Sequence, residues 1–313
     1  MLSERSAPYQ VPTRGGHLAV DVSGDPSGVP VFFLHGMPGS RHGPKPRPSV
    51  LYRLGVRLIT YDRPGYGGSS RHKGRSVADA ARDVATIADG LGLDHFAVVG
   101  RSGGGPHALA CAALLGERVR RTAALMSVAP PDADGLDWFQ GMTEDNTDAY
   151  TAAREDERTF ARELRLRAKE VKDDPDSILA RLEKEMTEPD RFRVRDFALR
   201  QLLAQSYVEG LREGADGWID DVLAICRNWR FDLDRIGGPV HLWHGVEDNF
   251  APVAHAEWLA GRIPNSVLDV QDCAAHFAAG DALMELLPWL IDWPYTPGPA
   301  SDLAVAASGR PPR

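Results

Sequence analysis

The chain has 313 residues, which is enough for one large domain or for a domain with a substantial insertion. Its net charge of −8, with 43% hydrophobic and 26% charged residues, is that of an ordinary globular protein and argues against the basic surface of a nucleic-acid binder. No apolar run reaches the roughly 18–20 residues of a membrane span, no signal peptide is recognisable, and the scattered cysteines form no CxxC pair, so we expect a cytoplasmic protein.

Short β-rich runs alternate with helical segments along much of the chain. The runs predicted as strands are 17–22, 31–35, 56–62, 96–100, 122–129, 239–244 and 266–271. Several of them are apolar throughout, as expected when helices cover both faces of a parallel sheet. Helices are predicted after Ser76, where Asp79 gives a start similar to a capping box, and from Gly103 onward. This alternation predicts an α/β fold with a mostly parallel central sheet flanked by helices.

The alternation stops in the middle of the chain. Residues 132–232 contain charge-rich helical segments and no convincing strand. Because the sheet needs the strands that follow, we predict a helical cap at 132–232, inserted into a core formed by 1–131 and 233–293. The final segment, 294–313, is rich in Pro, Gly, Ala and Ser, and we expect it to be disordered.

A glycine-rich turn joins the predicted strand at 96–100 to the helix after it. Its sequence, Gly-Arg-Ser-Gly-Gly, places Ser102 in a G-x-S-x-G pattern between a strand and a helix. Small neighbours let strand and helix approach each other and leave the Ser102 Oγ exposed above the sheet. The Gly103 N–H, at a helix N-terminus, is free to face negative charge. The pattern predicts Ser102 as a nucleophile; a tightly packed turn without a catalytic role is the alternative.

A second turn, His-Gly-Met-Pro-Gly, follows the strand at 31–35. Acyl transfer needs two N–H donors aimed at the tetrahedral oxyanion, one beside the nucleophile and one from another loop. The backbone N–H of Met37 is predicted as that second donor, together with Gly103. An ordinary Pro-Gly turn is the alternative.

Two loops late in the chain offer partners for the serine. Asp248 and His276 each follow a predicted strand, so both lie at carboxyl ends of strands, where the sites of α/β sheets assemble. We predict His276 as the general base and Asp248 as the acid that orients it. Asp132, which follows the predicted strand at 122–129, is the rival acid. His107, on the helix after Ser102, is predicted to serve in packing.

Several motifs taken together resemble the α/β-hydrolase superfamily in its capped branch. They are HGMPGS (35–40), YDRPGYGGSS (61–70), VVGRSGGG (98–105), HGVEDNFAP (244–252) and AAHF (274–277). The first is similar to the oxyanion loop of proline iminopeptidases and related esterases. The resemblance implies Ser102, Asp248 and His276 as a catalytic triad, with Met37 and Gly103 as oxyanion donors. A serine at the nucleophile position argues against the epoxide hydrolase and haloalkane dehalogenase branches, which use aspartate there.

We therefore expect a serine hydrolase that cleaves a carboxylic ester or lactone of a small molecule, with no cofactor, no metal, no nucleic acid and no membrane partner. One alternative is a hydrolase of amide, peptide or C–C bonds, with Glu209 and Glu213 as candidates to bind a free amine. Another is a lyase, cyclase or ligand-binding protein on the same fold. The alternative role of the large apolar candidates for the substrate pocket is to form the core of the insertion. The pocket candidates are Arg101, Trp138, Phe139, Met142, Trp218 and Trp229.

Overall fold

The computed structural model describes residues 8–297, and the structural statements below concern these residues. Of the tail predicted to be disordered, residues 294–297 have no regular secondary structure. The rest of that segment, 298–313, lies outside the described residues.

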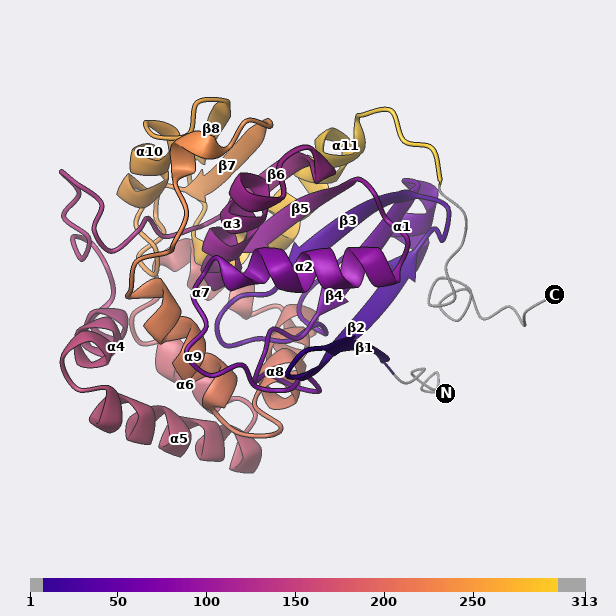
Figure 1. Cartoon of the computed structure of the whole chain (residues 1–313). Helices are drawn as coiled ribbons and strands as arrows, with labels where there is room; N and C mark the ends of the chain where they lie inside the picture. The colour runs from indigo at the N-terminus through magenta and orange to yellow at the C-terminus, as the bar shows by residue number, and fades with distance from the viewer. Residues whose placement is uncertain (1–7, 298–313) are drawn as a thin grey trace.

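An eight-stranded sheet forms the centre of the molecule, in the order β1-β2-β4-β3-β5-β6-β7-β8 (Figure 1). β2 pairs antiparallel with β1 and β4, and every other pair of neighbours is parallel, which confirms the predicted mostly parallel sheet. The strands are β1 (Tyr9–Thr13), β2 (Gly16–Gly24), β3 (Val29–Leu34), β4 (Val56–Tyr61), β5 (Phe96–Arg101), β6 (Val119–Leu125), β7 (Val240–Gly245) and β8 (Ser266–Gln271).

Two strands differ from the prediction. β6 begins at Val119 and ends at Leu125, earlier than the predicted 122–129, because the chain turns away at Met126, whose φ is +48°. β1 was not predicted. It contains Pro12, which has no N–H to donate, and such a residue is tolerated because β1 is an edge strand paired on one side only.

Helices cover both faces of the sheet. α1 (Pro48–Arg53) and α11 (Ala279–Ile291) place their apolar side chains in the core on one face. α2 (Asp79–Gly90), α3 (Gly105–Leu115) and α10 (Ala254–Ala260) contribute to the larger core on the other face. Because β3, β4 and β5 are thereby covered on both sides, almost all of their residues are buried, and most of them are apolar.

Between β6 and β7 the chain forms six helices and, within the described residues, no strand. They gather at one side of the molecule, beyond the sheet (Figure 1). We call this group the helical insertion: α4 (Glu144–Glu155), α5 (Glu157–Asp173), α6 (Ser177–Leu182), α7 (Glu188–Val194), α8 (Phe197–Gly210) and α9 (Asp216–Ile225). The helical character predicted for this part of the chain is observed. That it forms a cap with bounds at 132 and 232 stays a prediction.

Buried ion pairs join the helical insertion to the segment between β4 and α2. Asp221 of α9 accepts hydrogen bonds from Arg63, at 2.6 Å from its Nη2, and from Arg75. All three side chains are buried. Burial by itself would raise the pKa of Asp221, but the two guanidinium groups outweigh it and hold that pKa well below its usual range. Removing one partner would leave an unpaired charge in the interior, which is strongly destabilising.

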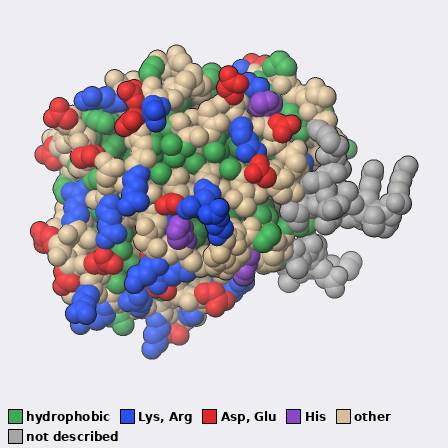
Figure 2. Space-filling model, viewed as in Figure 1, with side chains coloured by type: hydrophobic (Ala, Val, Ile, Leu, Met, Phe, Trp, Pro, Cys, Tyr) green, Lys and Arg blue, Asp and Glu red, His purple; other side chains and the backbone are tan. Residues whose placement is uncertain are grey.

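The surface carries both signs of charge. Figure 2 shows Lys and Arg side chains interspersed with Asp and Glu over the face in view, with hydrophobic side chains between them. Within residues 8–297, no helix combines the length and the apolar character that crossing a membrane requires.

Candidate active site

Ser102 lies on the turn between β5 and α3, at the start of a short 3-10 helix (Ser102–Gly104). Its φ is +52°, in the left-handed region that is unfavourable for a residue with a side chain. A Cβ on Gly100 would collide with the backbone of Gly104, and a Cβ on Gly104 would collide with the backbone at Leu34. The glycines of the motif are therefore required by close packing of strand against helix.

Three side chains from different loops form a continuous hydrogen-bonded chain. The Oγ of Ser102 lies 2.9 Å from Nε2 of His276. The Nδ1 of the same imidazole lies 2.8 Å from Oδ2 of Asp248. His276 opens a short 3-10 helix (His276–Ala278) after β8, and Asp248 lies in the loop after β7. The structure thus brings together the three residues that the sequence predicts as nucleophile, base and acid.

Asp248 is held in one orientation by its surroundings. Its Oδ1 accepts backbone N–H groups of Phe250 at 2.8 Å and of Ala251 at 2.9 Å, which leaves Oδ2 for the imidazole. Burial alone would raise the pKa of Asp248, but His276 and His244 beside it outweigh burial and keep that pKa well below its usual range. The carboxylate is therefore ionised at neutral pH and can orient the imidazole of His276.

The rival side chains lie elsewhere. Asp132 is exposed and forms no hydrogen bond or ion pair with His276 in the described part of the chain. His107 is buried, and its Nδ1 lies 2.7 Å from the carbonyl oxygen of Gly103. Burial lowers the pKa of His107 to about 3. Neither residue forms a hydrogen bond with Ser102 Oγ, which lies beside His276.

The loop after β3 presents a backbone N–H toward the turn that carries Ser102. The carbonyl oxygen of Gly36 accepts hydrogen bonds from Nη2 of Arg63 at 3.1 Å and from the His35 ring, whose Nδ1 lies 2.7 Å away. In a trans peptide the C=O and the N–H point in opposite directions, so the Met37 N–H faces away from Arg63. A Cβ built on Gly103 would lie 3.6 Å from the Met37 nitrogen. That N–H donates no hydrogen bond to any residue between 8 and 297.

A cavity of about 100 Å³ opens beside Ser102 and His276. The core contributes Met37, Pro38, Arg101 and Phe277 to its wall, and most of the remaining wall comes from the helical insertion. Apolar side chains of the insertion include Tyr150, Phe160, Leu164, Ile178, Trp218 and Val222. The insertion also contributes four charged side chains to the same wall: Asp145, Arg167, Glu170 and Arg181. The space suits a small molecule rather than a folded partner.

The sequence matches the family described as alpha/beta hydrolase fold over residues 29–282. The chain belongs to this family. A putative non-heme chloroperoxidase of Synechocystis sp. is 28% identical over 252 residues, covering 80% of this chain and 85% of that protein. The enol-lactonase of Burkholderia xenovorans LB400 superposes with a TM-score of 0.66 at 18% identity, covering 91% of this chain and 100% of the other. A thermophilic esterase from Thermogutta terrifontis has a TM-score of 0.64 at 22% identity, covering 92% and 100%.

The family match and these structures confirm the predicted α/β-hydrolase fold. At their sequence identities the two solved structures establish the fold and no substrate. This chain is accordingly an enzyme of the α/β hydrolase superfamily.

Three aromatic or apolar candidates for the pocket of this α/β hydrolase lie away from the cavity. Trp138, Phe139 and Met142 are not among the residues that line it, in contrast to Arg101 and Trp218. The ring of Trp138 is buried edge-on against Tyr150, and its Nε1 donates to a backbone carbonyl. Phe139 and Met142 are partly buried and pack against the hydrophobic core. Trp229 is likewise buried and does not line the cavity.

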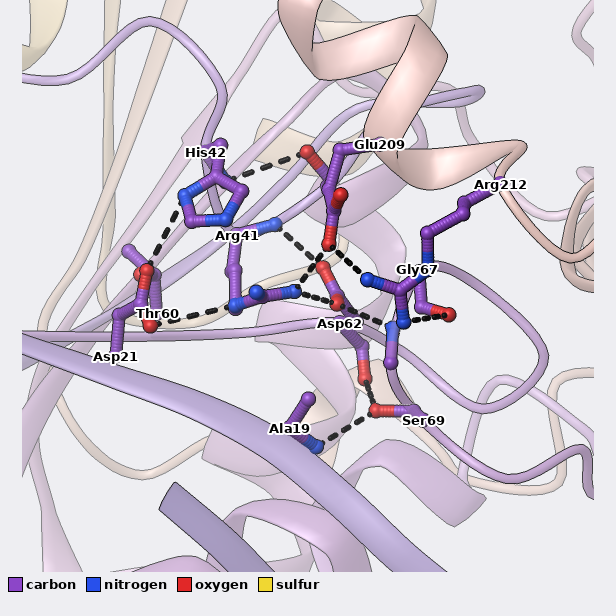
Figure 3. Close-up of polar contacts among 12 residues, drawn as sticks. Ala19, Asp21, Arg41, His42, Thr60, Asp62, Gly67, Ser69, Glu209 and Arg212 are labelled. Atoms are coloured by element: carbon purple, nitrogen blue, oxygen red, sulfur yellow. Dashed lines mark hydrogen bonds and ion pairs between the residues drawn. The ribbon is translucent and has the colours of Figure 1, made fainter. Parts of the chain in front are cut away.

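The carboxylates suggested for binding a free amine are also engaged elsewhere. Glu209 of α8 pairs with Nη1 of Arg41 at 2.9 Å and with Nη1 of Arg212 at 3.1 Å (Figure 3). Glu213 pairs with Nε of Arg212 at 3.2 Å. Arg41 also pairs with the buried Asp62, so the network joins α8 to the loops of the core. Neither glutamate lines the cavity.

Asp190 of α7 is a site residue that the sequence analysis missed. It is fully buried, its Oδ2 accepts the backbone N–H of His276 at 3.1 Å, and its Oδ1 accepts that of Phe277 at 2.7 Å. It thereby caps the short helix that carries the imidazole. Burial, opposed by these hydrogen bonds, raises the pKa of Asp190 to about 6. The sequence offers no signal for this contact, because the partners are 86 residues apart.

The described residues contain no group of three or more His, Cys, Asp or Glu side chains that could hold a metal ion.

Proposed function

We propose that this α/β hydrolase is a serine hydrolase that cleaves a carboxylic ester or lactone of a small molecule through an acyl-enzyme. The observation that carries the proposal is the hydrogen-bonded chain from Ser102 Oγ to His276 at 2.9 Å and from His276 to Asp248 at 2.8 Å. These distances lie within the reach needed for proton transfer between nucleophile and base.

In the proposed mechanism His276 Nε2 takes the proton of Ser102 as its Oγ attacks the carbonyl carbon. The oxyanion that forms is bound by the N–H groups of Met37 and Gly103. His276 then gives the proton to the leaving alkoxide, and an acyl-enzyme on Ser102 results. A water molecule, deprotonated by His276, attacks this ester, and the acid is released. Asp248 stabilises the imidazolium and fixes its tautomer throughout.

The helical insertion is proposed to act as the cap that selects the substrate. Its helices supply most of the cavity wall, and the apolar side chains among them favour the acyl or alcohol portion of a modest ester. An enol-lactonase and an esterase share the fold, and ester bonds are the bond type proposed here. A peptide substrate with a free amine is less well supported, because Glu209 and Glu213 are engaged in ion pairs outside the cavity.

The test is covalent labelling by a fluorophosphonate probe of the wild type, Ser102→Ala and His276→Ala, followed by a panel of 4-nitrophenyl esters, lactones and amides. We expect labelling and ester hydrolysis in the wild type and neither in the two variants. Labelling without ester or lactone turnover would move the assignment to amide or C–C bonds. A folded wild type that is not labelled would reject an activated serine and favour a lyase or binding role.

A further inference from the structure

Arg101, the residue directly before the nucleophile, carries a positive charge without a counterion. Within residues 8–297 its guanidinium forms no hydrogen bond and no ion pair, and its Nε is completely enclosed. Its guanidinium lies over the ring of Phe277, whose centroid is 6.0 Å from Cζ. Burial lowers the pKa of Arg101, although Tyr207 and Asp190 nearby oppose this. An arginine remains charged under these conditions, so the site holds an uncompensated cation.

Three buried arginines of the chain have the carboxylate partner that the half-buried Arg101 lacks. Arg41, Arg63 and Arg75 each form an ion pair with a buried aspartate. Charged groups in protein interiors are normally paired in this way because an isolated charge is costly to remove from water. Arg57 of β4 also pairs with no carboxylate among the described residues, but it does not line the cavity, whereas Arg101 does.

Two carboxylates near the cavity, those of Asp190 and Asp145, are engaged by other partners. Both oxygens of Asp190 accept backbone N–H groups of the His276 turn. Asp145 is shared between Arg167, at 3.0 and 3.1 Å, and Arg181, whose Nε lies 2.9 Å away. Glu170 also lines the cavity, but within residues 8–297 it forms no ion pair with Arg101. No carboxylate of the cavity wall therefore pairs with Arg101. Tyr207 lines the same cavity beside Arg101, and its hydroxyl group has no hydrogen-bond partner among the described residues.

We propose that Arg101, assisted by the hydroxyl group of Tyr207, binds a carboxylate of the substrate, so that the enzyme acts on esters or lactones that carry a second, free carboxylate. The inference rests on the proposed serine hydrolase function and specifies its substrate class. The guanidinium presents planar N–H donors that match a carboxylate, and an anion in the cavity would compensate its positive charge. Because Arg101 and Ser102 are adjacent, binding of this carboxylate would place the scissile ester at the other end of a short chain, at the nucleophile.

The experiment compares matched substrates that differ only in this charge. The mono-4-nitrophenyl esters of adipic and suberic acid carry a free carboxylate, and their methyl esters are neutral analogues of the same length. The measured quantity is the ratio of kcat/KM for the acid to kcat/KM for its methyl ester. For the wild type we expect this ratio to be about 10 to 100 at one or both chain lengths, as for a hydrogen bond to a charged group.

In Arg101→Met the ratio should fall to 1 or below. In Arg101→Lys it should lie between the ratios of the wild type and of Arg101→Met. The ratio cancels any general effect of the substitution on the strained turn. Arg227→Met is the matched control, because Arg227 is an exposed arginine that pairs with Glu157 and does not line the cavity. Its ratio should equal that of the wild type. Fluorophosphonate labelling of Ser102 is measured in the same preparations.

The two proposals fail in different ways. If the wild type is labelled and hydrolyses the methyl esters as well as the acids at both lengths, the carboxylate site is rejected and the serine hydrolase stands. The same conclusion follows if Arg101→Met keeps the wild-type ratio. If the folded wild type is not labelled and hydrolyses none of the esters, both proposals are rejected.

Discussion

Asp190, on a helix of the insertion, accepts the backbone N–H of His276, the proposed base, at 3.1 Å. The bond connects the helical insertion directly to the turn that carries the imidazole, and a second bond to the N–H of Phe277, at 2.7 Å, fixes the same turn. A base must be held within a fraction of an ångström of its productive position, so a partner of its backbone can influence the rate without touching the substrate.

Replacing Asp190 should therefore lower the rate of ester hydrolysis by more than the accompanying loss of folding stability explains. In Asp190→Ala we expect kcat for 4-nitrophenyl esters and the rate of fluorophosphonate labelling to fall about tenfold or more, with KM changed little. Asp196→Ala removes the N-cap of α8, where Oδ1 accepts the N–H of Leu199 at 2.8 Å, outside the cavity. This control should lose about 1 kcal/mol of stability and keep its labelling rate. Equal labelling rates in the two variants, measured well below their melting temperatures, would reduce Asp190 to a structural role.

Much of the site could be predicted from the sequence because it depends on local patterns. The G-x-S-x-G turn specifies the geometry around Ser102, and residues that follow parallel strands meet at one edge of the sheet, which brings Asp248 and His276 to it. The start of α2 is local as well: the N–H and Oγ of Ser76 lie 2.7 and 2.9 Å from Oδ2 of Asp79.

The remaining features depend on how the helices of the insertion pack. Nothing near Asp190 in the sequence indicates that α7 reaches the turn at His276. An aromatic side chain in an amphipathic segment can face either the cavity or the interior, and only the packing of α4 decides that Trp138 is buried while Trp218 lines the cavity. β1 was not predicted because it forms only by pairing with its neighbour, β2, and because its Pro12 is atypical of strands.

The role of Asp248 as the orienting acid can be separated from that of the rival Asp132. Asp248→Asn should lower kcat/KM by about 10³–10⁴-fold, because an amide favours the wrong tautomer of His276 and cannot stabilise its cation. Asp132→Asn alters an exposed side chain without a contact to His276 and should leave kcat/KM within twofold of the wild type. The comparison uses ester hydrolysis at one pH near 7. A large loss in Asp132→Asn with activity retained in Asp248→Asn would reverse the assignment.

The proposed oxyanion donors are backbone N–H groups, which no side-chain substitution removes. They are therefore tested by a substitution that moves the two loops carrying them apart. A Cβ on Gly103 would lie 2.7 Å from the Cβ of Met37 and push the two loops apart. Gly103→Ala should therefore lower kcat by about 10²–10³-fold, the loss typical of one missing donor. Gly280→Ala is the control, because a Cβ there has nothing within 4 Å in a helix, and it should be neutral or stabilising by about 0.5–1 kcal/mol. A fully active Gly103→Ala enzyme would argue against an oxyanion hole at this place.

Asp83 of α2 should make stability depend on pH. Its carboxyl group is buried and accepts no hydrogen bond from residues 8–297, and burial, only partly offset by Arg75 and Arg82, raises its pKa to about 7. Between about pH 4 and pH 7 the folded chain holds a proton that the unfolded chain has released, so the contribution of this group to stability falls as the pH rises through that window.

Asp83→Asn removes the titration and keeps the shape of the side chain. The variant should gain roughly 1–3 kcal/mol over the wild type at pH 8, where the buried carboxyl is ionised, and much less at pH 5, where it is neutral in the folded chain. Melting temperatures of both proteins at the two pH values measure this difference. Asp89→Asn, an exposed position on the same helix that pairs with Arg118, should show no such dependence on pH. A gain for Asp83→Asn that is the same at pH 5 and pH 8 would mean that the carboxyl is already ionised in the folded chain at pH 5.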